Sequence, residues 1–147
     1  MSALFERLQQ ELNAARKAQD KPRTLLLGTI VADVKNRRIE LRREPTEDEV
    51  VDVIRKGIKR RRESAEMYAS GGREELAARE RAEVEALEGF LPEQVSDEEL
   101  RSAVRAAIEG GATTIGAVMG KVLPQYKGRA EGSVVNAIAR EELAAKG

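Results

Sequence analysis

The sequence predicts an all-α protein, and three observations support this. Apolar residues recur at spacings of three and four along most of the chain, which is the period of a helix buried on one face. No segment shows the alternation of a half-buried strand. The composition is 35% charged and 3% aromatic, as in soluble helical proteins. We expect about four helices in a domain over residues 1–91 and three in a domain over residues 96–147, with a linker at 92–95.

Two helices are expected at the start of the chain. Ser2 is the expected N-cap of the first, because its hydroxyl can accept a backbone N–H one turn later. The apolar face of this helix consists of Leu4, Phe5, Leu8, Leu12 and Ala15. The second helix is expected over residues 22–43 and opens with a proline, which suits the first helical turn. Its apolar face consists of Leu27, Ile30, Val31 and Val34.

The third and fourth helices are expected to carry opposite charges. Thr46 and Glu49 match a capping box, so the third helix begins there and ends at the Ser-Gly-Gly of residues 70–72. Six of the eight residues from 55 to 62 are basic. The fourth helix, expected over residues 73–89, is rich in Glu. An antiparallel hairpin of these two helices would pair the two charge runs.

The predicted domain boundary is the sequence LPEQV at residues 91–95. Its proline disfavours helical backbone at the preceding residue. Ser96 and Glu99 then match a second capping box, which opens the fifth helix, and two glycines at 110–111 stop that helix.

Two shorter helices are expected to complete the chain. Thr114 is the expected cap of the sixth, which runs to about residue 123 and is ended by Pro124, and Ser133 is the expected cap of the seventh. Gly116 and Gly120 lie on one helix face, so we expect them to let another backbone approach closely. Residues 116–122 do not fit a phosphate loop, which needs four residues between its glycines and Ser or Thr after the lysine.

Catalytic chemistry is poorly represented in the sequence. Without cysteine or histidine there is no disulfide, no thiol chemistry and neither of the two common nucleophile–base systems. The acidic cluster of Glu47, Asp48 and Glu49 fits a helix start better than a metal site. We expect no catalytic residue, no metal and no cofactor. No apolar run approaches the ~18 residues of a membrane span, and the N-terminus lacks the apolar core of a signal peptide, so we expect a cytoplasmic protein.

Charge is balanced overall but unevenly placed. Residues 1–72 carry a net charge of +4, residues 73–99 one of −7 and residues 100–147 one of +3. Two basic stripes stand out, one on the second helix and one on the third. They consist of Lys35, Arg38 and Arg42, and of Arg55, Lys59 and Arg62. The stripes either follow a phosphate backbone or form solvated faces that pair partly with the acidic fourth helix.

A more particular feature is the turn before the seventh helix. Lys127 and Arg129 lie beside Gly128 and shortly before Gly132, where backbone N–H groups and the helix dipole favour anions. The turn is either a phosphate site or a solvated turn that needs its glycines.

The chain as a whole resembles the YqeY family, whose C-terminal part is shared with the tail domain of the B subunit of tRNA-dependent amidotransferases (the GatB/YqeY domain). The resemblance rests on ERLQQELNAARKAQDKPR, DVKNRRIELRREPTEDEV, IKRRRESAEMYASGGREELAARE, EVEALEGFLPEQVSDEELR and GAVMGKVLPQYKGRAEGSVVNAIA. The family pattern in the last stretch is Gly-Lys-Val-Met, a Pro, Lys-Gly-Arg-Ala-Asp-Gly and Val-Asn. This chain departs from it at Ala117, where Lys is usual, and at Glu131, where Asp is usual. The missing lysine weakens a phosphate site along the sixth helix and leaves the turn intact.

The resemblance implies a helical domain that helps to hold tRNA. It also associates the family with carbon–nitrogen ligases that use glutamine as amido donor, although the catalytic domain of the B subunit has no counterpart here. The candidate RNA-binding residues are Lys121, Lys127, Gly128, Arg129, Gly132 and Asn136, with the two basic stripes as a secondary surface. We therefore expect a non-catalytic module for tRNA or another structured RNA. The alternatives are an adaptor that docks on an amidotransferase or an aminoacyl-tRNA synthetase, and an amidotransferase in its own right.

Overall fold

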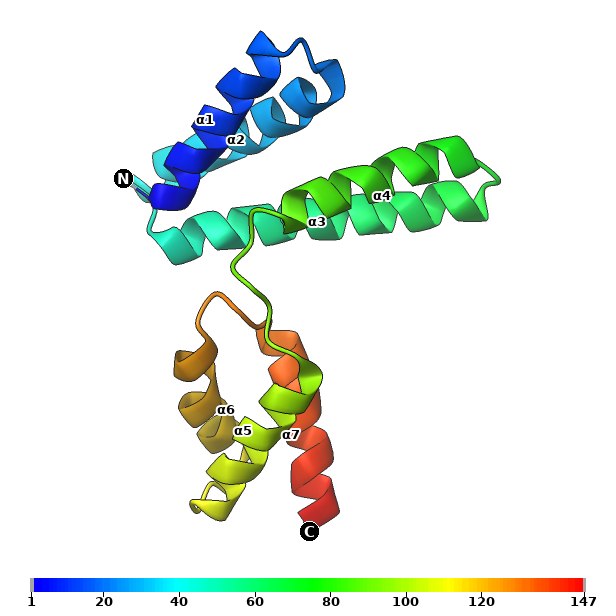
Figure 1. Ribbon diagram of the computed structural model, residues 1–147. Coiled ribbons are helices and arrows are strands. Elements are labelled where there is room, and N and C mark those ends of the chain that lie inside the picture. The colour runs from blue at the N-terminus through cyan, green and yellow to red at the C-terminus, as the bar shows by residue number, and fades with distance from the viewer. Residues whose placement is uncertain (1, 147) are drawn as a thin grey trace. The chain divides into compact units, whose positions relative to one another are not determined.

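A computed structural model describes residues 2–146, and within them the chain forms helices and no strand (Figure 1). The all-α prediction is confirmed. Contacts divide the chain into a first unit that ends at Leu91 and a second that begins at Pro92. The first unit contains α1 (Ala3–Lys17), α2 (Lys21–Leu41), α3 (Glu47–Ser70) and α4 (Glu74–Glu88). The second contains α5 (Asp97–Glu109), α6 (Ile115–Val122), the 3₁₀ helix η1 (Leu123–Tyr126) and α7 (Gly132–Lys146).

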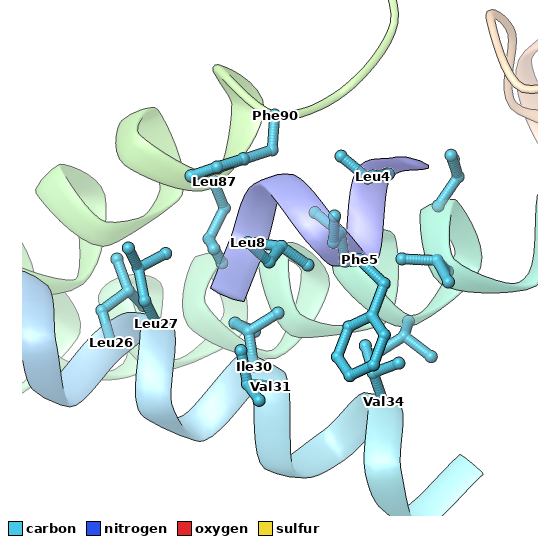
Figure 2. Close-up of a cluster of buried hydrophobic side chains, with 14 of the residues drawn as sticks. Leu4, Phe5, Leu8, Leu26, Leu27, Ile30, Val31, Val34, Leu87 and Phe90 are labelled. Carbon is cyan, nitrogen blue, oxygen red and sulfur yellow. The ribbon is translucent and has the colours of Figure 1, made fainter. Parts of the chain in front are cut away.

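The first unit consists of two helical hairpins, α1 with α2 and α3 with α4 (Figure 1). All four helices contribute to one apolar core, and Figure 2 shows side chains from them converging on it. The largest fully buried members are Phe5, Leu8, Leu27, Ile30, Ile54 and Leu87. Every apolar residue predicted to face inward on α1 and α2 is buried. Their spacing of three and four residues places these side chains on one face of each helix, and that face packs into the core.

Three of the N-caps in this unit follow the expected local chemistry. The Ser2 hydroxyl accepts the N–H of Phe5 at 3.1 Å. Asp20 caps α2, with Pro22 in its first turn. Thr46 and Glu49 form the predicted capping box, because the Thr46 hydroxyl accepts the Glu49 N–H and the Glu49 carboxylate accepts the Thr46 N–H.

Glu47 joins the start of α3 to the start of α1. Its Oε1 accepts the Ser2 hydroxyl at 3.0 Å and the Leu4 N–H at 2.8 Å. Its Oε2 accepts the Ala3 N–H at 3.0 Å. A carboxylate at the N-terminus of α1 satisfies donors that have no partner inside the helix and suits the helix dipole. The sequence placed Glu47 only in the first turn of its own helix.

The second helix has nearly the predicted length, but it begins at Lys21 and ends two residues earlier than expected. It ends at Leu41, because Arg42 adopts the left-handed conformation with φ 57°. The N–H of Arg42 still donates to the Arg38 carbonyl at 2.9 Å, so Arg42 closes the helix without extending it.

The second unit packs α5, α6 and α7 around its own core. Ser96 and Thr114 cap α5 and α6, and the Ser96 hydroxyl accepts the Glu99 N–H at 3.2 Å, which is one half of the predicted capping box. The α-helix α6 ends at Val122, close to the predicted end, and residues 123–126 then form the 3₁₀ helix η1 around Pro124. Ser133 is not the cap of α7, because the helix begins at Gly132 and the Glu131 carbonyl accepts the N–H of Val135 at 3.2 Å.

The glycines that permit close packing differ from those predicted. Gly116 and Gly120 are exposed, and a Cβ added at either would meet nothing within 4 Å, so the packing role predicted for them is wrong. Gly57 is buried on α3, where an added Cβ would lie 3.1 Å from Ile30 Cδ1 and 3.8 Å from Leu87 Cδ1. Burial at Gly57 depends on which helices cross there, and local spacing carries no such information.

Candidate nucleic-acid interface

The turn between η1 and α7 is held by backbone hydrogen bonds. Gly128 has φ 75°, a conformation that favours glycine. The Arg129 N–H donates to the Tyr126 carbonyl at 2.8 Å. The Arg129 carbonyl accepts the Val95 N–H at 3.1 Å, which ties the turn to the segment before α5. The glycine dependence expected for this turn therefore applies at Gly128.

Arg129 also contacts that segment through its side chain. Its Nε donates to the Glu93 carbonyl at 3.2 Å, and the residue is half-buried. The sequence suggested that Arg129 is a phosphate ligand on an open turn. The structure gives it a tethering role as well, which follows from a contact 36 residues away in the chain and has no local sequence signal.

The other candidate residues occupy different settings. Lys127 is exposed on the turn, and Gly132 is the exposed first residue of α7. Asn136 lies one turn along α7, and its Oδ1 accepts Nε of Arg140 at 2.8 Å. Lys121 is exposed on α6 and reaches the Gly110 carbonyl at the end of α5, with Nζ 3.4 Å from the oxygen. Lys121 thus lies on α6 and not on the turn, and its side chain has a hydrogen-bond partner at the end of α5.

Cationic charge is concentrated on one part of the second unit. Between residues 110 and 140 the sequence contains Lys121, Lys127, Arg129 and Arg140 but only one acidic residue, Glu131. Arg140 is exposed and was not among the predicted residues. Its spacing of four from Asn136 is the signal that could have identified it.

The arginines of α5 are neutralised within the unit. Arg101 contacts Glu141 and Glu142 at 2.8 Å each, and Nε of Arg105 lies 3.0 Å from Glu142. Hydrogen bonds from Arg105 and Arg101 hold the pKa of the Glu142 carboxyl below its usual range, and those from Arg101 to Glu142 and Glu141 raise the pKa of Arg101. Residues 110–140 hold four basic residues and one acidic residue, so this segment carries a net charge of +3 within a unit whose seven basic and eight acidic residues give −1.

The basic stripe predicted on α2 is interrupted. Arg38 pairs with Glu44 at 3.4 Å, and Arg42 lies beyond the end of the helix in the left-handed conformation. Lys35 is exposed on the side of α2 that meets α1, where it lines a groove. The three residues therefore do not form one continuous helical face.

The stripe predicted on α3 divides between two grooves. Arg62 pairs with Glu88 of α4 at 3.2 Å and lines the groove between these helices. Lys59 lines the groove between α2 and α3, where cations are matched by Asp33, Glu40, Asp52 and Glu63. Arg55 is half-buried. The predicted pairing of α3 with α4 is confirmed by the ion pair of Arg62 and by that of Arg61 with Glu83 at 2.9 Å.

The acidic cluster at the start of α3 has structural partners. Glu47 binds the start of α1, and Glu49 contacts Arg43 through both oxygens at 2.7 and 3.0 Å. These hydrogen bonds, with those from Thr46, lower the pKa of Glu49 to about 2. Residues 2–146 contain no group of three or more acidic side chains placed to hold a metal ion.

Among residues 2–146, every helix is too short or too polar to cross a membrane.

The chain is similar to known proteins along most of its length. A family model described as Yqey-like protein matches residues 5–143. The chain is 31% identical over 134 residues to "Altered inheritance of mitochondria protein 41, mitochondrial" of Pyrenophora tritici-repentis, covering 88% of this chain and 74% of that protein. It is 28% identical over 114 residues to the protein of the same name from Eremothecium gossypii, covering 76% of this chain and 62% of that protein. With a family match along nearly its whole length, this chain belongs to the YqeY-like family.

Proposed function

We propose that the second unit is a non-catalytic module that binds structured RNA, tRNA above all, through phosphate contacts. The observation that carries the proposal is the cationic segment of residues 110–140, where four basic residues accompany one acidic residue. Lys127 and Arg140 are exposed there and can be reached by a ligand. Phosphate contacts by such cations supply sequence-independent affinity for nucleic acid.

The anchoring of the turn supports the same proposal. Hydrogen bonds from Val95 and to Glu93 fix the backbone around Arg129 before any ligand arrives. A pre-organised loop loses less conformational freedom on binding than a mobile one. The first N–H groups of α7, at Gly132 and after it, add partial positive charge close to the turn in the chain.

The composition favours recognition of RNA shape over base stacking. Aromatic residues make up only 3% of the chain, so stacking platforms for single strands are scarce. Folded RNA is recognised largely through phosphates and 2′-hydroxyls. The choice of tRNA rests on the resemblance to the amidotransferase tail domain, and an amidotransferase or aminoacyl-tRNA synthetase is the class of partner enzyme that follows from it. A cytoplasmic location stays a prediction, and the two relatives are named as mitochondrial proteins.

The test measures tRNA binding by the full chain over a salt series, using fluorescence anisotropy. We expect a Lys127→Ala/Arg140→Ala variant to weaken binding. The slope of log K against log salt should fall by roughly 0.9 for each phosphate that is no longer neutralised. A Lys35→Ala/Lys59→Ala variant in the first unit is the charge-matched control and should keep most of the affinity. Unchanged affinity and slope in the first variant would remove the cationic segment from the proposal.

Arg129 needs a separate experiment because it tethers the turn. We expect Arg129→Ala to lower the melting temperature as well as RNA affinity, because it removes the hydrogen bond to the Glu93 carbonyl. The enzymatic alternative is tested with the same preparation. The pure chain is expected to release no ammonia from glutamine, and release above a heat-inactivated control would revive that alternative.

A further inference from the structure

The face of the α1–α2 hairpin that bears Lys35 carries a groove with no part in the proposed RNA site. Its volume is about 430 Å³. The residues that matter for the argument are Gln9, Asn13 and Arg16 on α1, and Gly28, Ala32 and Lys35 on α2. On each helix these positions are three and four residues apart, so each set forms one face along the groove.

Two of the residues that line the groove on α2 are small, and they lie beside the buried Leu12 and Val31. A Cβ at Gly28 would meet nothing within 4 Å, and Ala32 adds only a methyl group. Small side chains let a further helix approach at the short end of the usual range of about 8–10 Å between helix axes. The groove thus has a floor that suits a helix lying along it.

Two aliphatic side chains extend this face of α2 at both ends. Leu25 is 74% exposed and Ile39 is 71% exposed, although large aliphatic residues are most often buried. With the floor residues between them they give the series Leu25, Gly28, Ala32, Lys35 and Ile39. The spacing of three, four, three and four is the a/d pattern of a helix that packs along another helix.

The charges of the groove are of one sign. Among the described residues, its lining includes Arg16 and Lys35 and no carboxylate. Glu11 is an acidic residue of α1 close to these positions in sequence. Its Oε2 forms an ion pair with Nη2 of Arg23 at 3.2 Å. The groove between α2 and α3 is different, since carboxylates there balance its cations and ion pairs such as that of Arg60 with Asp33 cross it.

We propose that this groove docks an amphipathic helix of a partner protein whose apolar stripe is flanked by Asp or Glu. Apolar side chains of that helix would cover Leu25 and Ile39, and its carboxylates would meet Arg16 and Lys35. A phosphate backbone would satisfy the cations but leave both aliphatic side chains in water. Helix-in-groove recognition satisfies both features at once.

The test uses three synthetic fluorescent peptides, each of about six helical turns, and the full chain. The first peptide has Leu at positions a and d and Glu at e and g. The second has the same composition in scrambled order, and the third has Lys in place of Glu. We expect the first peptide alone to bind the wild-type chain in anisotropy titrations. Equal binding of the scrambled peptide would overturn the proposal.

Two variants test the geometry of the groove. Arg16→Glu/Lys35→Glu should weaken binding of the acidic peptide by about tenfold or more, because the new carboxylates repel its Glu side chains. The same variant should bind the Lys peptide, because the charges of groove and peptide are again opposite. Gly28→Leu should fill the floor and abolish binding while the chain stays folded, because nothing lies within 4 Å of that Cβ. If neither variant changes binding, the groove is not the docking site.

A third variant separates this proposal from the RNA proposal. Lys121→Glu/Lys127→Glu changes the second unit and should leave peptide affinity unchanged while lowering tRNA affinity. The Arg16→Glu/Lys35→Glu variant should do the reverse. If Arg16→Glu/Lys35→Glu instead abolishes binding of tRNA or of vesicles containing phosphatidylserine, and the acidic peptide does not bind, the groove serves a phosphate ligand and the helix proposal is wrong.

Discussion

At the scale of single residues, the glycines of this chain show how surroundings decide what a residue does. Gly57 lies where α2 and α4 approach α3, and its missing side chain makes room for Ile30 and Leu87. Gly28 lies mid-helix, and a Cβ added there would meet nothing within 4 Å, so the absence of a side chain gives no packing benefit within this chain. The two positions should therefore respond to substitution in opposite directions.

We expect Gly57→Leu to lower the free energy of unfolding by about 1–3 kcal/mol, because added atoms must displace the Ile30 and Leu87 side chains. Gly28→Ala should raise it by roughly 0.5–1 kcal/mol through helix propensity. Urea denaturation followed by circular dichroism measures both. A neutral Gly57→Leu change would mean that the helices do not pack closely at that point.

At the scale of elements, α1 depends on a residue of α3. Three donors at the start of α1 bind the Glu47 carboxylate. A second set of contacts joins α1 to the residues that follow α4. There Arg7 lies 4.7 Å from the centre of the Phe90 ring and donates to the Gly89 carbonyl at 3.2 Å. The N-terminus of α1 is thus held by α3, and the Arg7 side chain of α1 is held by the residues that follow α4.

Glu47→Ala should cost about 1–3 kcal/mol, since it leaves part-buried donors of α1 without their acceptor. The backbone amides of Ala3 and Leu4 should exchange with solvent faster, which hydrogen exchange measured by NMR detects. Glu66→Ala, an exposed change on the same helix, is the control and should leave both quantities near their wild-type values. Unaltered exchange at Ala3 and Leu4 would contradict the tie between α1 and α3.

At the scale of the whole molecule, acid stability is linked to the connection between α2 and α3. The folded pKa of Glu49 lies at about 2, below its usual value of 4.5, mainly because of the hydrogen bonds from Arg43 and then those from Thr46. A lowered folded pKa means that the unfolded chain binds a proton first as the pH falls. The stabilisation is therefore complete above about pH 4.5 and is lost progressively toward pH 2.

We expect the free energy of unfolding to fall between pH 4.5 and pH 2, and to fall less steeply in a Glu49→Gln variant, which has no carboxylate to protonate. Denaturation midpoints measured at a series of pH values test this. The difference should shrink at high salt, because the pair is solvent-accessible. Parallel pH profiles for the two proteins would show that this pair does not contribute to acid stability.

The sequence alone determined the helical elements, most of their caps and the inward faces of the helices. Those features depend on periodicity and on hydrogen bonds between residues three or four apart, as at Thr46 and Glu49, so local rules suffice. The cationic turn was also visible from its residues, Lys127 and Arg129.

Only the tertiary structure decided the partners of these residues. It tied Arg129 to Glu93, Glu47 to the start of α1 and Arg62 to Glu88. In the folded chain Gly116 is exposed and Gly57 is buried. These outcomes depend on which helices pack side by side, and residues from 26 to 45 positions apart meet there. Spacing along one helix specifies its faces, and the packing of the whole unit determines what each face meets.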